Sequence, residues 1–344
     1  MTEIDRLREF RSEVPESPGL DAEEARLRAA VAGAADPAAG GARRRFRFRG
    51  RMALAGALAA GAAVAVATVA VAVDDPAPGA PGPIVRTMPV AHVRVLQQAA
   101  DRAGEAPELH PKPGQYLVIE SRMMNTAEVN GADGQVKYLY QVERTMWRPY
   151  EGDSTRAVLR TTVLPPKQWP GRPIPEEARR GVGETSTEKA ADFDGRAEWL
   201  RTDYAYLSKL PTTAEGMYAH LYTGLGTGPE ADAQAWQNLG GMLTEAYLPA
   251  AQRAALFRAA AAIPGVTTVG RAVDAAGRTG VAVALDVPGT GIRTEYVFDP
   301  DTYDYLGERG VVTDASRAQA PVGSVLTATA QLGVRVADAP PPVR

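Results

Sequence analysis

The sequence predicts an α+β domain carried on a single transmembrane helix, with a short tail on the other side of the membrane. Two observations lead to this prediction. One uninterrupted apolar segment divides the 344 residues into a short N-terminal part and a long C-terminal part. In the long part, runs of alternating residues stand before and after a block of helical periodicity. Grouped strands and helices of this kind are typical of α+β folds with an antiparallel sheet.

The apolar segment covers residues 52–73 and holds 22 residues without a charge, Pro, Asn or Gln. As a helix it would be about 33 Å long, which is enough to cross a hydrocarbon core of about 30 Å. Six arginines precede it closely: Arg43, Arg44, Arg45, Arg47, Arg49 and Arg51. Because basic residues stay on the cytoplasmic side, we expect a cell-membrane protein with a cytoplasmic N-terminus and an extracytoplasmic C-terminal domain.

Two other interpretations of this segment were considered. A cleaved export signal would account for the A-x-A sequence at 70–72 and for the arginines before Phe46. However, a signal core has about 7–15 apolar residues, and Arg47 stands where a twin-arginine motif has an apolar residue. A buried core helix would ordinarily carry polar residues on one side. The anchor is therefore the preferred interpretation.

Composition changes on either side of the anchor set the remaining boundaries. We expect a cytoplasmic tail at 1–51, a Pro-rich linker at 74–90, an extracytoplasmic domain at 91–337 and a disordered end at 338–344. The tail holds two short helical patterns, at about 2–14 and from Asp21 onwards. Helices of that length are marginal alone in water, so the tail is either disordered or folds on a cytoplasmic protein partner.

Charge and composition exclude some classes of function for the outer domain. The chain has 27 basic and 32 acidic residues after the anchor, so the outer part lacks the basic excess of a nucleic-acid-binding domain. The sequence contains no Cys, and its three histidines, His92, His110 and His220, are far apart in the sequence. We therefore expect no disulfide, no metal and no cofactor.

The outer domain is predicted to begin with a helix at 90–103 and to continue as strands at 115–124, 135–148 and 156–164. Segments 125–134 and 169–188 are predicted loops, and Pro165 and Pro166 are expected to end the third strand. A Thr212–Glu215 capping box begins a central helix, and two further helices follow at about 229–247 and 249–263. An antiparallel meander then covers 266–273, 280–287 and 293–298, and 324–336 is a candidate edge strand.

Aromatic residues on the second strand are the best candidates for a ligand cleft. Tyr138, Tyr140 and Trp147 could hold an apolar ligand outside the membrane. The alternative is an ordinary core, in which helices carrying Trp236 and Phe257 cover this sheet face. We favour the closed core, because buried aromatic side chains are the commoner outcome.

Three motif-like stretches are too weak to carry chemistry. Gly224 to Gly228 begins like a dinucleotide loop but lacks the third glycine, and we expect a connection between helices. Asp299, Asp301 and Asp304 lack the Gly and Glu of a calcium loop, so a hairpin turn is expected. Ser186 to Lys189 matches S-x-x-K in a polar stretch without an apolar wall to lower the pKa of the lysine.

Several stretches together carry a resemblance to a known protein family. They are REFRSEVPE, PKPGQYLVIES, LPAAQRAALFRAAAAIPGVTTV with DAAGRTGVAVAL, and YVFDPDTYDYLGER. With the anchor, they make the chain resemble an uncharacterised actinobacterial family of single-pass membrane proteins. The resemblance implies an association with alternative sigma factors, which makes the tail a candidate anti-sigma segment. The tail has two predicted helices where anti-sigma domains usually have about four.

The predicted element order also resembles lipoprotein-carrier and periplasmic sensor domains, in which a curved antiparallel sheet half-wraps a helix. This analogy concerns the fold alone. The sequence therefore favours a membrane-anchored extracytoplasmic sensing or binding protein without catalytic activity. The alternatives are a membrane-bound anti-sigma regulator and an exported hydrolase without a recognisable motif.

Overall fold

The computed structural model describes residues 91–131, 134–152, 156–190 and 201–343, which all belong to one compact unit of the chain. The predicted tail, anchor and linker lie outside the described residues, as do the six arginines. Among the residues described, no helix is both long enough and apolar enough to cross a membrane.

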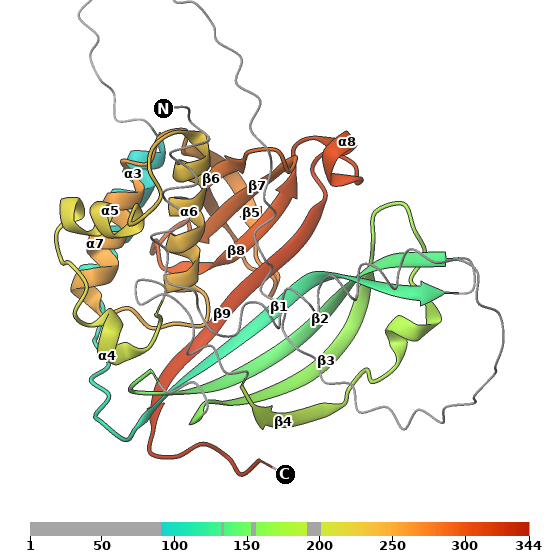
Figure 1. Cartoon of the computed structure of the whole chain (residues 1–344), viewed down its shortest axis with the longest axis horizontal. Helices are drawn as coiled ribbons and strands as arrows, with labels where there is room; N and C mark the ends of the chain where they lie inside the picture. Colours follow the sequence, from blue (N-terminus) through green and yellow to red (C-terminus); the bar gives the residue numbers. More distant parts are fainter. Residues whose placement is uncertain (1–90, 132–133, 153–155, 191–200, 344) are drawn as a thin grey trace, which may run out of the picture. The chain divides into compact units, whose positions relative to one another are not determined.

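The described unit is a mixed α and β fold built on one antiparallel sheet of nine strands (Figure 1). The strands lie in the order β4-β3-β2-β1-β9-β8-β7-β6-β5. They are β1 (Tyr116–Gly131), β2 (Gly134–Pro149), β3 (Val158–Gln168), β4 (Thr185–Lys189), β5 (Thr267–Val273), β6 (Thr279–Val287), β7 (Ile292–Phe298), β8 (Tyr305–Val312) and β9 (Val325–Ala337). The helices are α3 (Ala91–Glu105), η2 (Glu176–Arg179), α4 (Tyr204–Leu207), α5 (Ala214–Leu221), α6 (Pro229–Leu243), α7 (Ala250–Ala260) and α8 (Ala315–Ala318).

The antiparallel sheet is confirmed, but its strands differ from the predicted ones in two ways. β1 and β2 pair without interruption along all 16 residues of each, so 125–130 is strand and not part of a long loop. β4 begins at Thr185, inside the segment 169–188 that was predicted to be a loop. In both places polar residues occupy strand positions, and polarity alone therefore does not indicate a loop.

Two proline residues also lie inside a strand and do not end it. β3 continues through Pro165 and Pro166 to Gln168, and its pairing with β2 shifts between Leu139 and Gln141. A bulge at this position tolerates residues that cannot donate a backbone hydrogen bond. The Gln141 side chain donates to the Pro165 carbonyl at 2.6 Å.

The last strand is central and joins the two halves of the sheet, so the prediction of an edge strand is wrong. β9 pairs with β1 on one side and with β8 on the other. Leu326, Ala328 and Ala330 on this strand are buried. The strand that comes last in the sequence thus joins the first four strands to the meander.

Helices α3, α5, α6 and α7 form a layer on one face of the sheet, over the half that contains β5 to β8 (Figure 1). The main core lies between this layer and the sheet. Trp236 of α6 packs on Tyr296 of β7 with ring centroids 4.7 Å apart, and Phe257 of α7 meets Phe298 edge-on at 5.3 Å. Alanines on α3 and α7 are buried between these two helices, and their small side chains allow the backbones to approach closely.

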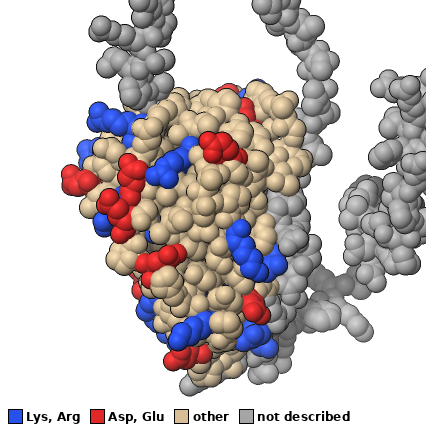
Figure 2. All heavy atoms as spheres, turned by 90° about the vertical axis from the view of Figure 1, so that its left-hand side faces the viewer, with Lys and Arg blue, Asp and Glu red and all other residues tan. Residues whose placement is uncertain are grey.

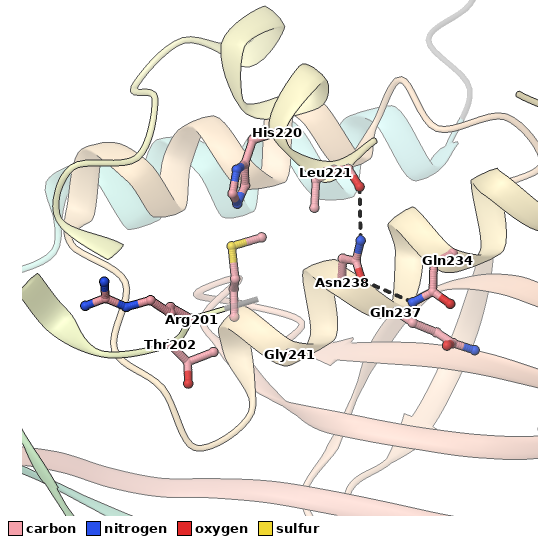
Figure 3. A pocket seen from close by; sticks show the side chains of 9 residues that line it. Arg201, Thr202, His220, Leu221, Gln234, Gln237, Asn238 and Gly241 are labelled. Atoms are coloured by element: carbon pink, nitrogen blue, oxygen red, sulfur yellow. Dashed lines mark hydrogen bonds between the residues drawn. The ribbon is translucent and has the colours of Figure 1, made fainter. Parts of the chain in front are cut away.

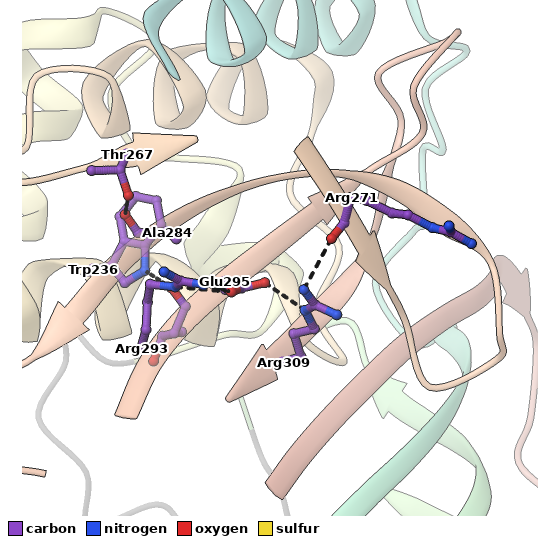
Figure 4. A network of polar contacts seen from close by, with 8 residues as sticks. Trp236, Thr267, Arg271, Ala284, Arg293, Glu295 and Arg309 are labelled. Atoms are coloured by element: carbon purple, nitrogen blue, oxygen red, sulfur yellow. Dashed lines mark hydrogen bonds and ion pairs between the residues drawn. The ribbon is translucent and has the colours of Figure 1, made fainter. Parts of the chain in front are cut away.

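The opposite face of the sheet carries a buried ion network (Figure 4). Glu295 of β7 is fully buried, and its two oxygens bind Arg293 and Arg309, each at 2.6 Å. A buried carboxylate of this kind needs both partners, because an unpaired charge in such a place is strongly destabilising. The network is therefore a structural part of this face.

Candidate functional site

The best candidate site is a cavity of about 200 Å³ between α3, the end of α6, α7 and the turn that joins β7 to β8. We call it the Arg253 cavity. Its wall is formed by small and aliphatic residues of α3 and α6, and its distinctive side chains are Arg102, Tyr247, Arg253, Phe257, Tyr303 and Tyr305. The cavity combines aromatic walls with two guanidinium groups. Ligand pockets are typically concave and apolar with a few polar groups, so this cavity has the character of a ligand pocket.

Arg253 of α7 is the most unusual residue of the cavity. Its Nε atom is buried, and among the described residues this side chain makes no hydrogen bond and no ion pair. Its guanidinium lies 6.0 Å from the ring centroid of Tyr247. Burial lowers the pKa of Arg253, and the nearby Tyr247, Asp304 and Glu108 oppose this shift. An arginine nevertheless stays charged, so a mostly unpaired cation faces the cavity.

The other arginines near the cavity are paired. Arg102 of α3 binds Asp304 at 3.1 Å, with both side chains about half exposed at the rim. Arg258 lies one and a half turns after Arg253 on α7, where its exposed side chain binds Asp101 at 3.1 Å. Arg258 on the same helix has an ion-pair partner. The lack of a partner for Arg253 therefore results from its position beside the cavity and not from α7 as a whole.

Tyr303, which lines the cavity, and Glu245, which precedes the lining residue Ala246, adopt left-handed backbone conformations. Tyr303, in the β7–β8 turn, has φ of 60°, and Glu245, after α6, has φ of 52°. Among the residues described, Gln319 is the third residue other than glycine with positive φ. This conformation is uncommon outside glycine and is enriched at functional sites, where surrounding contacts must hold it in place.

Contacts with the sheet hold the segment around Glu245. The Ser121 hydroxyl of β1 donates to Glu245 at 2.8 Å, and Arg144 of β2 forms an ion pair with it at 3.3 Å. The adjacent Tyr247 hydroxyl accepts a hydrogen bond from the Leu109 backbone at 2.7 Å. These contacts fix the wall of the cavity that Tyr247 provides.

A second carboxylate, Glu308 of β8, lies under α6 beside the cavity residue Tyr305. Burial raises the pKa of Glu308 from its ordinary 4.5 to about 7, although the Thr244 hydroxyl opposes the shift. Burial and the charge of Glu308 both raise the pKa of Tyr305. The hydroxyls of Tyr305 and Thr244 are buried, and neither makes a hydrogen bond of normal geometry. The cavity thus has a titratable group close to its inner end.

A smaller hollow of about 150 Å³ lies between α5 and α6, on the other side of α6 (Figure 3). His220, Gln234, Asn238 and Arg201 are among its lining residues. Asn238 donates to the Leu221 carbonyl and accepts from Gln234, each at 3.1 Å, and Arg201 binds Asp203 at 2.9 Å. Since Gln234, Asn238 and Arg201 already have partners, this hollow is the weaker candidate.

The aromatic residues of the predicted cleft are not brought together. Residues 138 and 140 share one face of β2, while residue 147 points to the other face, because side chains alternate along a strand. Trp147 packs there with Tyr116, Val118 and Val158. A cleft formed jointly by Tyr138, Tyr140 and Trp147 is therefore wrong, and the odd spacing from 140 to 147 could have shown this.

The prediction that helices close the face of Tyr138 and Tyr140 is also wrong. Both side chains are half-buried, and Asn125 donates to the Tyr140 hydroxyl at 3.4 Å. Trp236 and Phe257 pack on β7 instead. The helical layer covers the meander half of the sheet, whereas these tyrosines lie on the other half.

The weak motifs lie where turns and loops were predicted. Gly224 to Gly228 connect α5 to α6, and the Asp299 carboxylate accepts from the backbone of Asp301 and Thr302 in the β7–β8 turn. Ser186 and Lys189 lie on β4 three residues apart, so they point to opposite faces. The three histidines are not brought together, and no group of potential metal ligands is found in the part of the chain that the structure describes.

Sequence reasoning missed the Arg253 cavity. One signal was present: Arg253 stands three residues after Ala250 and four before Phe257, on the stripe of α7 that faces the core. A basic residue at such a position needs a partner or a special environment.

The helical side of the unit shows charges of both signs interspersed over its surface (Figure 2). This distribution differs from the single-sign stripe typical of nucleic-acid-binding faces. No protein-family model matches the chain, and a comparison with curated proteins finds no significant match. The proposals that follow therefore rest on the residues and their geometry.

Proposed function

We propose that this chain is a membrane-anchored binding or sensing protein whose extracytoplasmic domain holds a small molecule in the Arg253 cavity. The observation that carries the proposal is the mostly unpaired cation on the wall of a cavity lined by tyrosines and Phe257. These side chains form a binding surface, since they offer apolar area, a charge and hydroxyl groups. The function is binding without catalysis.

The anchor and the orientation in this proposal rest on the sequence. The apolar segment 52–73 would tether the domain, and the six preceding arginines would keep the tail in the cytoplasm. The tail would then contact a cytoplasmic protein partner, as in the anti-sigma alternative. The sheet also supports the analogy to lipoprotein carriers, because its strands continue beyond the helical layer, as they would in a half-wrapped sheet (Figure 1).

The test asks whether the cavity is occupied in the native protein. The full chain is extracted from its membrane and its mass is measured under non-denaturing conditions. Ala103→Phe places a large side chain in the cavity, and Ala251→Phe places the same side chain at an exposed position of α7. We expect a bound small molecule in the unsubstituted protein and in Ala251→Phe, and its loss in a folded Ala103→Phe. Absence of bound mass in all three, or equal occupancy in all three, would contradict the proposal.

A further inference from the structure

One charged side chain that lines the Arg253 cavity lacks an ion-pair partner among the residues described, and this indicates the class of ligand. Arg102 and Asp304 compensate each other at the rim. The Glu108 carboxylate accepts from the backbone of Ala250 at the start of α7, at 3.3 Å. Among the described charged side chains that line the cavity, Arg253 is therefore the one whose charge is not balanced by an ion pair.

We infer that the cavity binds a small organic monoanion, with a carboxylate held by Arg253 and an apolar body held against the aromatic wall. This inference rests on the proposed function and names the ligand class of the same site. An unpaired cation that is largely removed from water is unfavourable, and a bound anion relieves this cost. Arg253 lines the cavity, and a planar guanidinium can donate two parallel hydrogen bonds to a carboxylate.

The shape of the cavity limits the rest of the ligand. Its volume of about 200 Å³ is below the roughly 300–1,000 Å³ of sites that take drug-sized molecules, so the ligand is compact. Phe257, Tyr303 and Tyr305 provide faces on which a flat apolar body can lie. A benzoate-like molecule has this combination of size, charge and shape.

A neighbouring carboxylate disfavours more highly charged anions. Glu308 lies beyond the cavity residue Tyr305, and in its ionised form it repels a second negative charge on the ligand. Inorganic phosphate, which is partly a dianion at neutral pH, is therefore expected to bind more weakly than benzoate.

The experiment compares benzoate with benzamide, a neutral molecule of nearly the same shape, and uses phosphate as a third probe. Binding to the full chain in detergent is measured by calorimetry. We expect benzoate to bind at least about tenfold more tightly than benzamide or phosphate, since about 1.4 kcal/mol of charge pairing corresponds to tenfold. Arg253→Gln should remove this preference by weakening the binding of benzoate. Arg258→Gln, which alters an exposed arginine of the same helix, should keep the preference.

The other outcomes separate the ligand class from the proposed function. Equal binding of benzoate and benzamide would overturn the anionic ligand class but leave the cavity as a binding site. Binding of no probe would overturn both. If Arg253→Gln does not fold, Arg253→Lys keeps the charge without the planar fork, and it should reduce the benzoate preference without abolishing it. A preference unchanged in either variant would show that Arg253 does not hold the anion.

Discussion

Glu308 is the residue whose protonation should influence the stability of this domain most clearly. Its raised pKa, about 7, means that the folded protein retains a proton that the unfolded chain releases near pH 4.5. The folded state therefore binds more protons between these two values, and the free energy of unfolding falls as pH rises through this window. The stabilisation is fully present below about pH 4.5 and is lost above about pH 7.

Replacement of Glu308 by Gln should remove this pH dependence. We expect Glu308→Gln to match the unsubstituted protein near pH 4.5 and to be more stable by about 1–3 kcal/mol at pH 8, because an amide carries no charge to bury. Urea denaturation of the full chain at several pH values measures the difference. Glu120→Gln changes an exposed carboxylate of β1 and serves as the control. A stability difference that is constant between pH 4.5 and pH 8 would contradict this account of Glu308.

Residue patterns in the sequence could predict secondary structure but not which side chains would meet. Alternation located β2 correctly, and the same alternation separates Trp147 from Tyr140. Whether Tyr140 would be covered could not be predicted, because the helices of the layer are far from it in the sequence: α3 ends at Glu105, and the next helix of the layer, α5, begins at Ala214. The pairing of Arg102 and the lack of a partner for Arg253 likewise depend on tertiary packing.

At the scale of elements, the approach of α6 to the sheet depends on one glycine. A Cβ atom at Gly240 would collide with the Tyr296 hydroxyl and would lie 3.0 Å from Glu308 Oε2. The Tyr296 hydroxyl donates to the Trp236 carbonyl at 2.6 Å, so any shift would disturb the contact between α6 and β7. The neighbouring Gly241 has no atom within 4 Å of the corresponding position.

These two glycines should respond to alanine in opposite ways. We expect Gly240→Ala to lower the free energy of unfolding by about 1–3 kcal/mol, since it overpacks the interface between α6 and β7. Gly241→Ala should raise it by about 0.5–1 kcal/mol, because alanine favours the helix and open space receives the methyl group. Thermal or urea denaturation of the two variants provides the measurement. Equal effects of the two substitutions would argue against the close approach at Gly240.

The helices and the meander could be predicted from local signals, whereas the order of strands could not. The N-cap of α5 is Thr213, one residue after the predicted Thr212. Its hydroxyl accepts a hydrogen bond from the backbone of Gly216 at 3.2 Å. Pro249 is the N-cap of α7 and not its first helical residue. The position of β9 between β1 and β8 is a long-range pairing, and the alternation of apolar residues along a strand does not specify its neighbours.

For the whole molecule, the central claim is that a binding domain stands outside the membrane on a single anchor. The claim rests on two observations. The charges on the two sides of residues 52–73 differ in sign, and the described domain contains a cavity. The absence of Cys from the sequence makes a direct test available, because every introduced thiol is the only one. Val322 of the described domain is 67% exposed, and Ser17 lies in the predicted tail.

The decisive measurement is the reaction of Val322→Cys and Ser17→Cys with a maleimide that does not cross membranes. In intact spheroplasts, we expect Val322→Cys to react and Ser17→Cys to react only after detergent is added, because the six arginines before the apolar segment are expected to keep the tail in the cytoplasm. Reaction of both variants after lysis shows that both thiols are accessible. Labelling of Ser17→Cys with protection of Val322→Cys in intact spheroplasts, or release of a mature protein that begins near Asp74, would contradict the account.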